Sequence, residues 1–270
     1  MLLNLIGVLF AAVGSGILYA CLEDLSPWWL WLSLPGFLIG WFVLYFAVLW
    51  IVSLFFPKKE PEKANGVCLF FVGITLDWLM RVMRVKITLS GTGLLPDCPC
   101  VIVSNHRSDF DPMTVLAVLR KRKLAYISKE SNFKIPIVGP FIRRAGFLAI
   151  DRENGMRAMR TLKAASLRMK NEQMDMGIYP EGTRSKNGEL LEFKTGAFYL
   201  AKRAEAPIVV MATEGTERIS KNFPWRQTKV SLRFLKVIDT DTVKGSSFED
   251  LAAQSRGILS QALSKDYGAL

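Results

Sequence analysis

The sequence is poor in the side chains that bind transition metals. One histidine, His106, occurs in 270 residues, and the four cysteines are Cys21, Cys68, Cys98 and Cys100. Their spacing matches no zinc-ligand set and shows no paired framework of the disulfide kind. We therefore expect no metal site and no disulfide bonds.

Several short motifs with a known chemistry are also missing. The sequence contains no G-x-x-x-x-G-K-[ST], G-x-G-x-x-G or G-x-S-x-G pattern, which argues against a nucleotide-binding loop and against a serine nucleophile on a sharp turn. It also has no recognised nucleic-acid reader motif and no basic strip with interleaved aromatic residues. The formal charge of +11 therefore does not by itself indicate nucleic-acid binding.

Basic residues are absent from the N-terminal fifth of the chain. Residues 1–56 contain no Lys or Arg and only two acidic residues, so the other 214 residues hold all 35 basic residues and 22 of the 24 acidic ones. This split indicates a membrane anchor followed by a basic domain. A cleaved signal sequence is the weaker alternative, because the start has no basic region and Tyr19 fits poorly in the lipoprotein-like site Leu18–Cys21.

Two apolar runs are long enough to cross a hydrocarbon core of about 30 Å. The first is Leu2–Cys21; the second, Trp28–Phe56, contains Pro35-Gly36, which places the predicted crossing at Phe37–Phe56. The expected interfacial tryptophans are Trp28, Trp29 and Trp31. The acidic residues Glu23 and Asp24 lie between the two runs, and the lysines Lys58, Lys59 and Lys63 follow the second. The positive-inside rule puts the N-terminus and everything after residue 56 in the cytoplasm.

A polar linker, Pro57–Asn65, separates this hairpin from the rest. The apolar run Val67–Leu76 is too short to span a membrane, and Asp77, Arg81 and Arg84 follow it at helical spacing. These residues predict a helix that either lies along the bilayer surface or packs in a core.

From Val85 onward, short apolar runs alternate with helical stretches. The expected strands are Val85–Leu89, Val101–Ser104, Leu124–Ser128, Phe147–Ile150, Met176–Tyr179, Pro207–Ala212 and Lys229–Val237. The expected helices are Pro112–Lys121, Gly155–Asn171, Leu191–Ala204 and Phe248–Ser264. This alternation predicts an α/β fold with a mixed, mostly parallel sheet flanked by helices. The chain then divides into a transmembrane hairpin at 1–56, a linker and interfacial helix at 57–84, and a cytoplasmic domain at 85–270.

The single histidine lies in a polar turn that follows the apolar run Val101–Ser104. Asp109 and Asp111 lie within five residues of His106, and Asp111-Pro112 suits the start of a helix. Histidine is the side chain whose ordinary pKa lies nearest neutrality, so this turn is a candidate for acid–base chemistry. Two other interpretations stay open: Asp111 as a simple helix cap, and His106 as an ordinary surface or core residue.

Charged residues follow two further predicted strands directly. Arg152 comes after Phe147–Ile150, and Glu181 and Arg184 come after Met176–Tyr179. In open α/β sheets, ligands bind outside the carboxyl ends of the strands, so these side chains could share one cleft with His106. Arginine is well shaped to hold a phosphate, although each arginine could instead form an ordinary ion pair with Asp151 or Glu181.

Four stretches in this order resemble the glycerolipid acyltransferase family, and most closely its lysophosphatidic acid acyltransferases. They are Asn105-His106-x4-Asp111, Phe147–Arg152, Pro180–Ser185 and Pro207–Val209. The resemblance covers about Val85–Met211 together with the hydrophobic N-terminus. Leu148-Ala149, Tyr179 and Ala206 stand where many members carry other apolar residues, which leaves the acceptor less certain than the chemistry.

The resemblance implies a role for each matching residue. His106 would be the general base and Asp111 its orienting partner. The acceptor phosphate would be bound by the following residues: Lys129, Arg152, Glu181, Gly182, Thr183 and Arg184. A thioester donor already carries its leaving group, so Ser104 or Ser108 as a nucleophile is the weaker alternative.

The implied reaction transfers a fatty acyl group from a thioester to the free hydroxyl of lysophosphatidic acid, giving phosphatidic acid. The expected co-substrate is acyl-CoA or acyl-carrier protein, with no cofactor, and the expected partners are membrane lipids and not nucleic acid. The resemblance implies an integral membrane protein with a cytoplasmic catalytic domain, as at a bacterial cell membrane. Alternatives are the same reaction on another lysolipid and a catalytically silent lipid-binding scaffold, which the presence of both His106 and Asp111 disfavours.

One further segment, Asn132–Arg144, alternates aromatic, aliphatic and basic residues around two prolines. Two interpretations stay open for it. It could dip into the lipid headgroup region and admit a lipid to the cleft, or it could be a packed surface loop.

Overall fold

A seven-stranded sheet forms the centre of the protein. The computed structural model describes residues 2–22, 26, 28–185 and 187–267. The strands are β1 (Val85–Ser90), β2 (Val101–Ser104), β3 (Leu124–Lys129), β4 (Leu148–Ile150), β5 (Asp175–Ile178), β6 (Ile208–Glu214) and β7 (Thr228–Ile238). Their order is β1-β7-β6-β2-β5-β3-β4. Neighbours are parallel except β6 and β7, which are antiparallel. The predicted mixed, mostly parallel sheet is confirmed.

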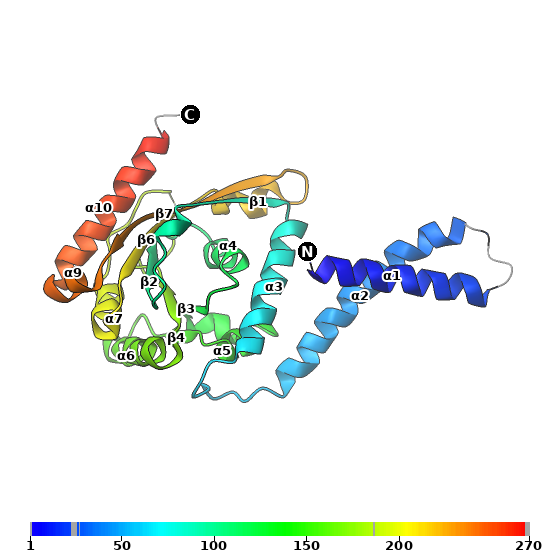
Figure 1. Cartoon of the computed structure of the whole chain (residues 1–270), viewed down its shortest axis with the longest axis horizontal. Coiled ribbons are helices and arrows are strands. Elements are labelled where there is room, and N and C mark those ends of the chain that lie inside the picture. The colour runs from blue at the N-terminus through cyan, green and yellow to red at the C-terminus, as the bar shows by residue number, and fades with distance from the viewer. Residues whose placement is uncertain (1, 23–25, 27, 186, 268–270) are drawn as a thin grey trace.

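Helices cover both faces of this sheet (Figure 1). The helices and 3-10 turns are α1 (Leu2–Cys21), α2 (Trp28–Leu54), α3 (Gly66–Val82), η1 (Thr92–Leu94), α4 (Phe110–Val118), η2 (Glu130–Lys134), α5 (Val138–Arg144), α6 (Gly155–Glu172), α7 (Gly196–Ala204), η3 (Thr216–Arg218), α8 (Ile219–Asn222), α9 (Thr240–Gly245) and α10 (Phe248–Tyr267). In Figure 1, α6, α7, α9 and α10 lie on one side of the sheet and α3 and α4 on the other. Strands β2 and β5 are buried along their whole length, which places the core at the centre of the sheet.

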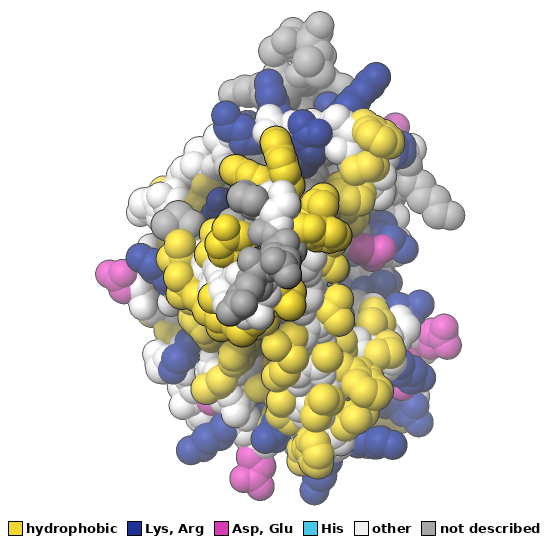
Figure 2. All heavy atoms as spheres, turned by 90° about the vertical axis from the view of Figure 1, so that its right-hand side faces the viewer, with side chains coloured by type: hydrophobic (Ala, Val, Ile, Leu, Met, Phe, Trp, Pro, Cys, Tyr) yellow, Lys and Arg dark blue, Asp and Glu magenta, His cyan; other side chains and the backbone are white. Residues whose placement is uncertain are grey.

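The helices α1 and α2 form a hairpin that projects from the α3 side of the domain (Figure 1). Both are long and apolar enough to cross a membrane, with mean hydropathies of 2.0 for Leu2–Cys21 and 2.4 for Trp31–Leu54. They pack closely, since a Cβ at Gly14 would lie 2.7 Å from the Phe37 ring. Figure 2 shows hydrophobic side chains gathered on the face from which the hairpin projects, with Lys and Arg around its margin.

The prediction that Pro35-Gly36 divides the second apolar run is wrong. Helix α2 runs through Pro35 without interruption. Helices of this kind tolerate proline because neighbouring groups and small local adjustments satisfy the freed carbonyl. Glu23 and Asp24, predicted to lie between the spans, fall outside the described residues. The division of the chain at residues 56 and 84 stays a prediction.

The linker before α3 is fastened to the domain by hydrogen bonds to α6 and to the end of α5. Buried Arg168 donates to the carbonyls of Pro61 at 2.7 Å and Gly146 at 3.1 Å. The Ala64 amide donates to Glu172 Oε2 at 2.6 Å, and the Asn65 amide donates to the Arg144 carbonyl at 2.6 Å. We call this set of hydrogen bonds the linker strap. These hydrogen bonds hold the polar linker in place, although the linker itself forms no helix or strand.

Helix α3 packs on the domain along one face, and its predicted position along a bilayer surface stays a prediction. Asn65 caps it, because its side-chain oxygen accepts from the amides of Val67 and Cys68. One face packs on α4, α5 and β1, whereas Val67 and Phe70 on the other face are 63% and 52% exposed.

Two helix predictions need correction. The helix predicted at Leu191–Ala204 begins only at Gly196, because the amides of Leu191 and Lys194 donate to Glu181 Oε2 and to the Pro180 carbonyl. Helix α5 was not predicted, since Pro136 and Pro140 suggest a loop. Pro140 is in fact the third residue of α5, where a backbone amide would have no partner within the helix.

Candidate active site

His106 and Asp111 form a hydrogen-bonded pair at the carboxyl end of β2. His106 Nδ1 lies 2.8 Å from Asp111 Oδ2, and the side chains are 12% and 0% exposed. An ionised carboxylate only accepts hydrogen bonds, so Nδ1 carries the proton and Nε2 keeps its lone pair. No hydrogen bond to Nε2 is present among the described residues. The arrangement leaves the outer ring nitrogen able to accept a proton.

The Asp111 carboxylate is held on all sides. Besides His106, Oδ2 accepts from the amides of Arg107 at 2.7 Å and Ser108 at 2.9 Å, and the Thr216 hydroxyl donates to Oδ1. These amides lie before α4, so Asp111 closes the turn that carries His106 and does not act as an ordinary helix cap. The local sequence therefore fixes both the ring and its partner.

Glu181 ties a second strand end to the histidine turn. Its side chain is buried, Oε1 accepts from the His106 amide at 2.6 Å and Oε2 accepts from the Leu191 amide at 3.1 Å. The Ser185 amide also donates to the His106 carbonyl at 2.9 Å. Burial raises the pKa of Glu181, and the two donated amide bonds oppose that rise. Both carboxylate oxygens of Glu181 therefore accept hydrogen bonds within the protein and hold the histidine turn against the segment after β5.

The His106 ring is the first of a column of three stacked rings. The His106 and Tyr179 rings have centroids 4.1 Å apart and planes 14° apart. Tyr126 from β3 stacks on the other side of Tyr179 with a centroid distance of 5.5 Å. Gly177 makes room for Tyr126, since a Cβ there would lie 2.3 Å from the Tyr126 ring. Stacking and the carboxylate together leave the imidazole one orientation.

The predicted cationic residues lie along the neighbouring strand ends. Arg184 donates to Asp109 Oδ2, and both side chains are largely exposed. The pKa of Arg152 is lowered, chiefly by burial and further by the positive charge of Arg184. The second effect means that the two guanidinium groups are near each other. Asp151 pairs with Arg157 and not with Arg152.

The other predicted residues occupy the same edge. Lys129 is exposed at the end of β3, in register with Ile150, two residues before Arg152. Gly182 has φ of +69°, a conformation that favours glycine, and Thr183 is exposed beside it. The structure thus brings His106, Asp111, Glu181 and Arg184 together, with Arg152 near Arg184. Lys129 is placed at this edge by strand register alone.

Two neighbouring residues escaped the sequence reasoning. Thr216 follows β6 and could have been found by considering the end of that strand as well as its start. Lys194 lies beside Gly182, with Nζ 3.0 Å from where a Cβ at that position would lie. It was assigned to a helix, and its sequence context offers no signal for this placement.

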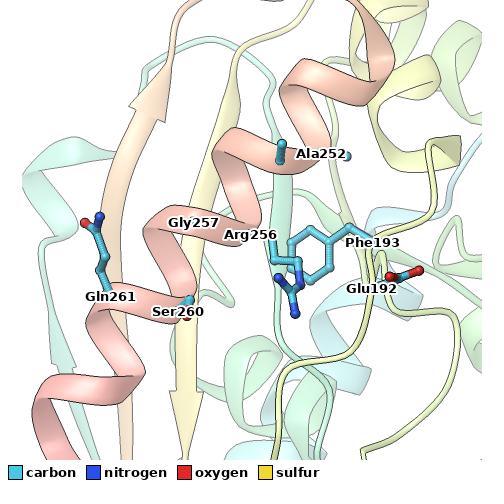
Figure 3. Close-up of a pocket in the computed structure, with 8 residues that line it drawn as sticks. Glu192, Phe193, Ala252, Arg256, Gly257, Ser260 and Gln261 are labelled. Carbon is cyan, nitrogen blue, oxygen red and sulfur yellow. The ribbon is translucent and has the colours of Figure 1, made fainter.

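A hollow of about 550 Å³ lies apart from these residues, against α10. It is lined by Glu192, Phe193, Ala252, Ala253, Arg256, Gly257, Ser260 and Gln261. Figure 3 shows Arg256 of α10 next to Phe193. The Arg256 guanidinium donates to the carbonyls of Leu190 and Leu191 at 3.2 and 3.1 Å. This hollow contains no predicted site residue.

Comparison with known proteins finds a family match over the same part of the chain. Residues 86–214 match the family model described as Acyltransferase. The domain is therefore that of an acyltransferase.

Its curated relatives narrow the family. The chain is 45% identical over 111 residues to human 1-acyl-sn-glycerol-3-phosphate acyltransferase beta, covering 41% of this chain and 40% of that protein. It is 27% identical over 165 residues to 1-acyl-sn-glycerol-3-phosphate acyltransferase of Haemophilus influenzae, covering 61% and 68%. These matches support the resemblance to the glycerolipid acyltransferase family that the four motifs indicated.

A solved structure supports the fold. The crystal structure of the 1-acyl-sn-glycerophosphate (LPA) acyltransferase PlsC from Thermotoga maritima has a TM-score of 0.63 with 23% identity. The match covers 82% of this chain and 88% of that one. It extends beyond the acyltransferase domain, because residues 86–214 are less than half of the chain.

Proposed function

We propose that this protein transfers a fatty acyl group from an acyl thioester to the free hydroxyl of lysophosphatidic acid, giving phosphatidic acid. The observation that carries the proposal is the buried His106–Asp111 pair, with Arg184 bound to Asp109 of the same turn. The relatives named as 1-acyl-sn-glycerol-3-phosphate acyltransferases support the same acceptor.

The geometry suits a direct transfer. His106 Nε2 takes the proton of the acceptor hydroxyl as the oxygen attacks the thioester carbonyl, and the thiol of the donor leaves. Asp111 stabilises the imidazolium that forms, and general base catalysis of this kind contributes about 10²- to 10⁴-fold in rate. No covalent bond to the protein is needed.

The oxygen of the thioester gains negative charge and needs hydrogen-bond donors. The amides of Arg107, Ser108, Phe110 and Asp111 all have acceptors already. The Gly182 amide donates to the Tyr179 carbonyl. Among the described residues no acceptor is seen for the amides of Asp109 and Thr183, so these two are candidate donors to the oxyanion.

Arg152 and Arg184, with Lys129 and Lys194 nearby, form a cationic rim suited to the acceptor phosphate. Holding the phosphate fixes the free hydroxyl against His106, which turns binding energy into orientation. The donor is acyl-CoA or acyl-carrier protein, both of which are anionic and suit the basic domain. The lysines after α2 favour a cytoplasmic site.

The test is acyl transfer by purified protein in membranes, with lysophosphatidic acid and lysophosphatidylethanolamine as alternative acceptors. His106→Ala should abolish turnover with little change in acceptor binding, whereas Arg184→Ala should chiefly raise the acceptor KM. Transfer to both acceptors at equal rates would remove the phosphate specificity. The reverse pattern of kinetic effects would remove the assigned roles.

A further inference from the structure

We propose that a second lipid site, separate from the catalytic cleft, binds an anionic phospholipid where the hairpin meets the catalytic domain. A pocket of about 420 Å³ lies there between the C-terminal end of α2, the start of the linker, and the segment from η2 to α5. It is lined by Trp50, Ser53, Leu54, Phe56, Pro57, Lys58, Phe133, Lys134, Ile135, Pro136, Ile137, Pro140 and Arg143. None of the residues placed at the catalytic cleft is among them.

One part of the pocket wall is apolar and suits the acyl chains of a lipid. Trp50 and Leu54 on α2, 50% and 62% exposed, face the same space as Phe133 and Ile135. These side chains could pack along an acyl chain. Apolar surface of this kind gains about 25 cal/mol for each Å² that a chain covers.

The rim of the pocket is cationic. The cationic side chains that line it are Lys58, Lys134 and Arg143. Lys134 forms an ion pair with Glu130 at 3.4 Å. The Lys134 side chain is 74% exposed, so its ammonium remains open to another anion. Three cations beside one acid leave an excess positive charge that suits a phosphate.

The pocket is built into the fold. The Phe56 ring packs edge-on against Phe141 at 5.1 Å, and the Arg144 guanidinium lies 5.7 Å from the same ring. Arg143 lies over the Phe133 ring at 5.6 Å and donates to the Lys58 carbonyl. These contacts join the end of the hairpin to the domain and keep the two walls apart by a fixed amount.

The segment that forms the other wall has a constrained backbone. Ile137 has φ of +63°, a region that β-branched residues rarely occupy. Gly139 has no space for a side chain, because a Cβ there would lie 2.2 Å from the Phe133 carbonyl oxygen. Strain of this kind persists where the surrounding structure enforces it and is concentrated at binding sites.

The position of the pocket matches a bilayer surface. The apolar helix ends at Leu54, and Lys58 and Lys59 follow within five residues. The face from which the hairpin projects is apolar with a basic margin (Figure 2). A phospholipid lying beside α2 would therefore place its phosphate at the level of Lys58 and Lys134. This inference depends on the hairpin lying in a membrane, and not on the proposed reaction.

The experiment uses the full chain in detergent micelles, with dioctanoyl phosphatidylglycerol as the anionic probe and dioctanoyl phosphatidylcholine as the control. A ligand that binds the folded state raises the apparent Tm. At ten times its dissociation constant, phosphatidylglycerol should raise the Tm by about 3–6 °C, and phosphatidylcholine should raise it less. Acetylation of Lys58 and Lys134 should fall in its presence, with Lys163 on α6 unchanged.

Three variants locate the binding. Lys58→Gln/Lys134→Gln should lose the shift, while Arg160→Gln/Lys163→Gln, an equal charge change on α6 outside the pocket lining, should keep it. Arg184→Gln should also keep the shift, since Arg184 belongs to the proposed acceptor-phosphate site and does not line this pocket. Equal shifts with both lipids, a shift that survives Lys58→Gln/Lys134→Gln, or a shift lost in Arg184→Gln would each overturn the proposal. Acyl transfer measured on the same preparations tests the proposed function separately.

Discussion

Replacing Asp111 with Asn isolates the charge of this carboxylate from its geometry. The Asn oxygen can occupy the place of Oδ2, where it would still accept from the amides of Arg107 and Ser108 and from the ring of His106. The Asn amide group would then face Thr216, whose hydroxyl can rotate to accept a hydrogen bond. The histidine should therefore keep its orientation and its tautomer.

The expected loss is the stabilisation of the imidazolium formed during the reaction. Hydrogen bonds to charged groups contribute about 1.5–3 kcal/mol, against about 0.5–1.5 kcal/mol for neutral ones. Two opposite charges about 4 Å apart attract by about 4 kcal/mol at an effective dielectric constant of 20. Together these values give a loss of about 2–4 kcal/mol, or a fall in kcat of about 30- to 1000-fold.

The assay compares kcat, acceptor KM and the apparent Tm of wild type and Asp111→Asn. Only kcat should change greatly. Asp111→Ala is the contrasting variant, because it leaves two part-buried amides, the Thr216 hydroxyl and the His106 ring N–H without this acceptor, at up to about 1–3 kcal/mol each, and should also lower the Tm. A kcat for Asp111→Asn within threefold of wild type would refute the view that the carboxylate charge assists proton transfer.

Three further predictions follow from the site. Gly182→Ala should fold but lose acceptor affinity, seen as a higher KM, because its φ of +69° disfavours alanine and the new methyl group would meet Lys194. Gly177→Ala should lower the Tm and kcat together, since the Tyr126 ring must shift and the ring column with it; an unchanged kcat would separate the column from catalysis. Burial raises the pKa of Glu181 in the folded state above its usual 4.5. At a pH between the unfolded-state and folded-state pKa, the folded protein keeps a proton that the unfolded chain has lost, so the stability falls as the pH rises through this interval. Glu181→Gln should remove this fall in thermal unfolding measured across the acidic range, and an identical pH dependence would contradict it.

The sheet was predictable because its strands are apolar runs bounded by turns. Each of the seven predicted strands matches an observed one to within two residues at either end, and β2 matches at both ends. Helix starts were harder to predict. Leu191 begins an apolar, helix-like pattern, yet Glu181 captures its amide, and that interaction joins residues ten apart through a fold the local sequence does not encode.

The candidate site was predictable in so far as it follows strand ends. His106, Glu181 and Arg184 could be grouped because the carboxyl ends of parallel strands meet at one edge of a sheet. The column of stacked rings could not be predicted from the sequence. Tyr126 and Tyr179 look like ordinary core aromatic residues until β3 and β5 are known to be adjacent. The assigned roles of these residues stay predictions.

The linker strap has a consequence for how the enzyme meets its lipids. Because Arg168, Glu172 and Arg144 fasten residues 61–65 to the body of the domain, the hairpin cannot swivel freely on a loose tether. If the hairpin lies in a membrane and His106 is the base, as proposed, the fold sets the height and tilt of His106 relative to the bilayer. Under that proposal a lysolipid would have to reach this height to react, and the depth of the hairpin in the bilayer would select among acceptors.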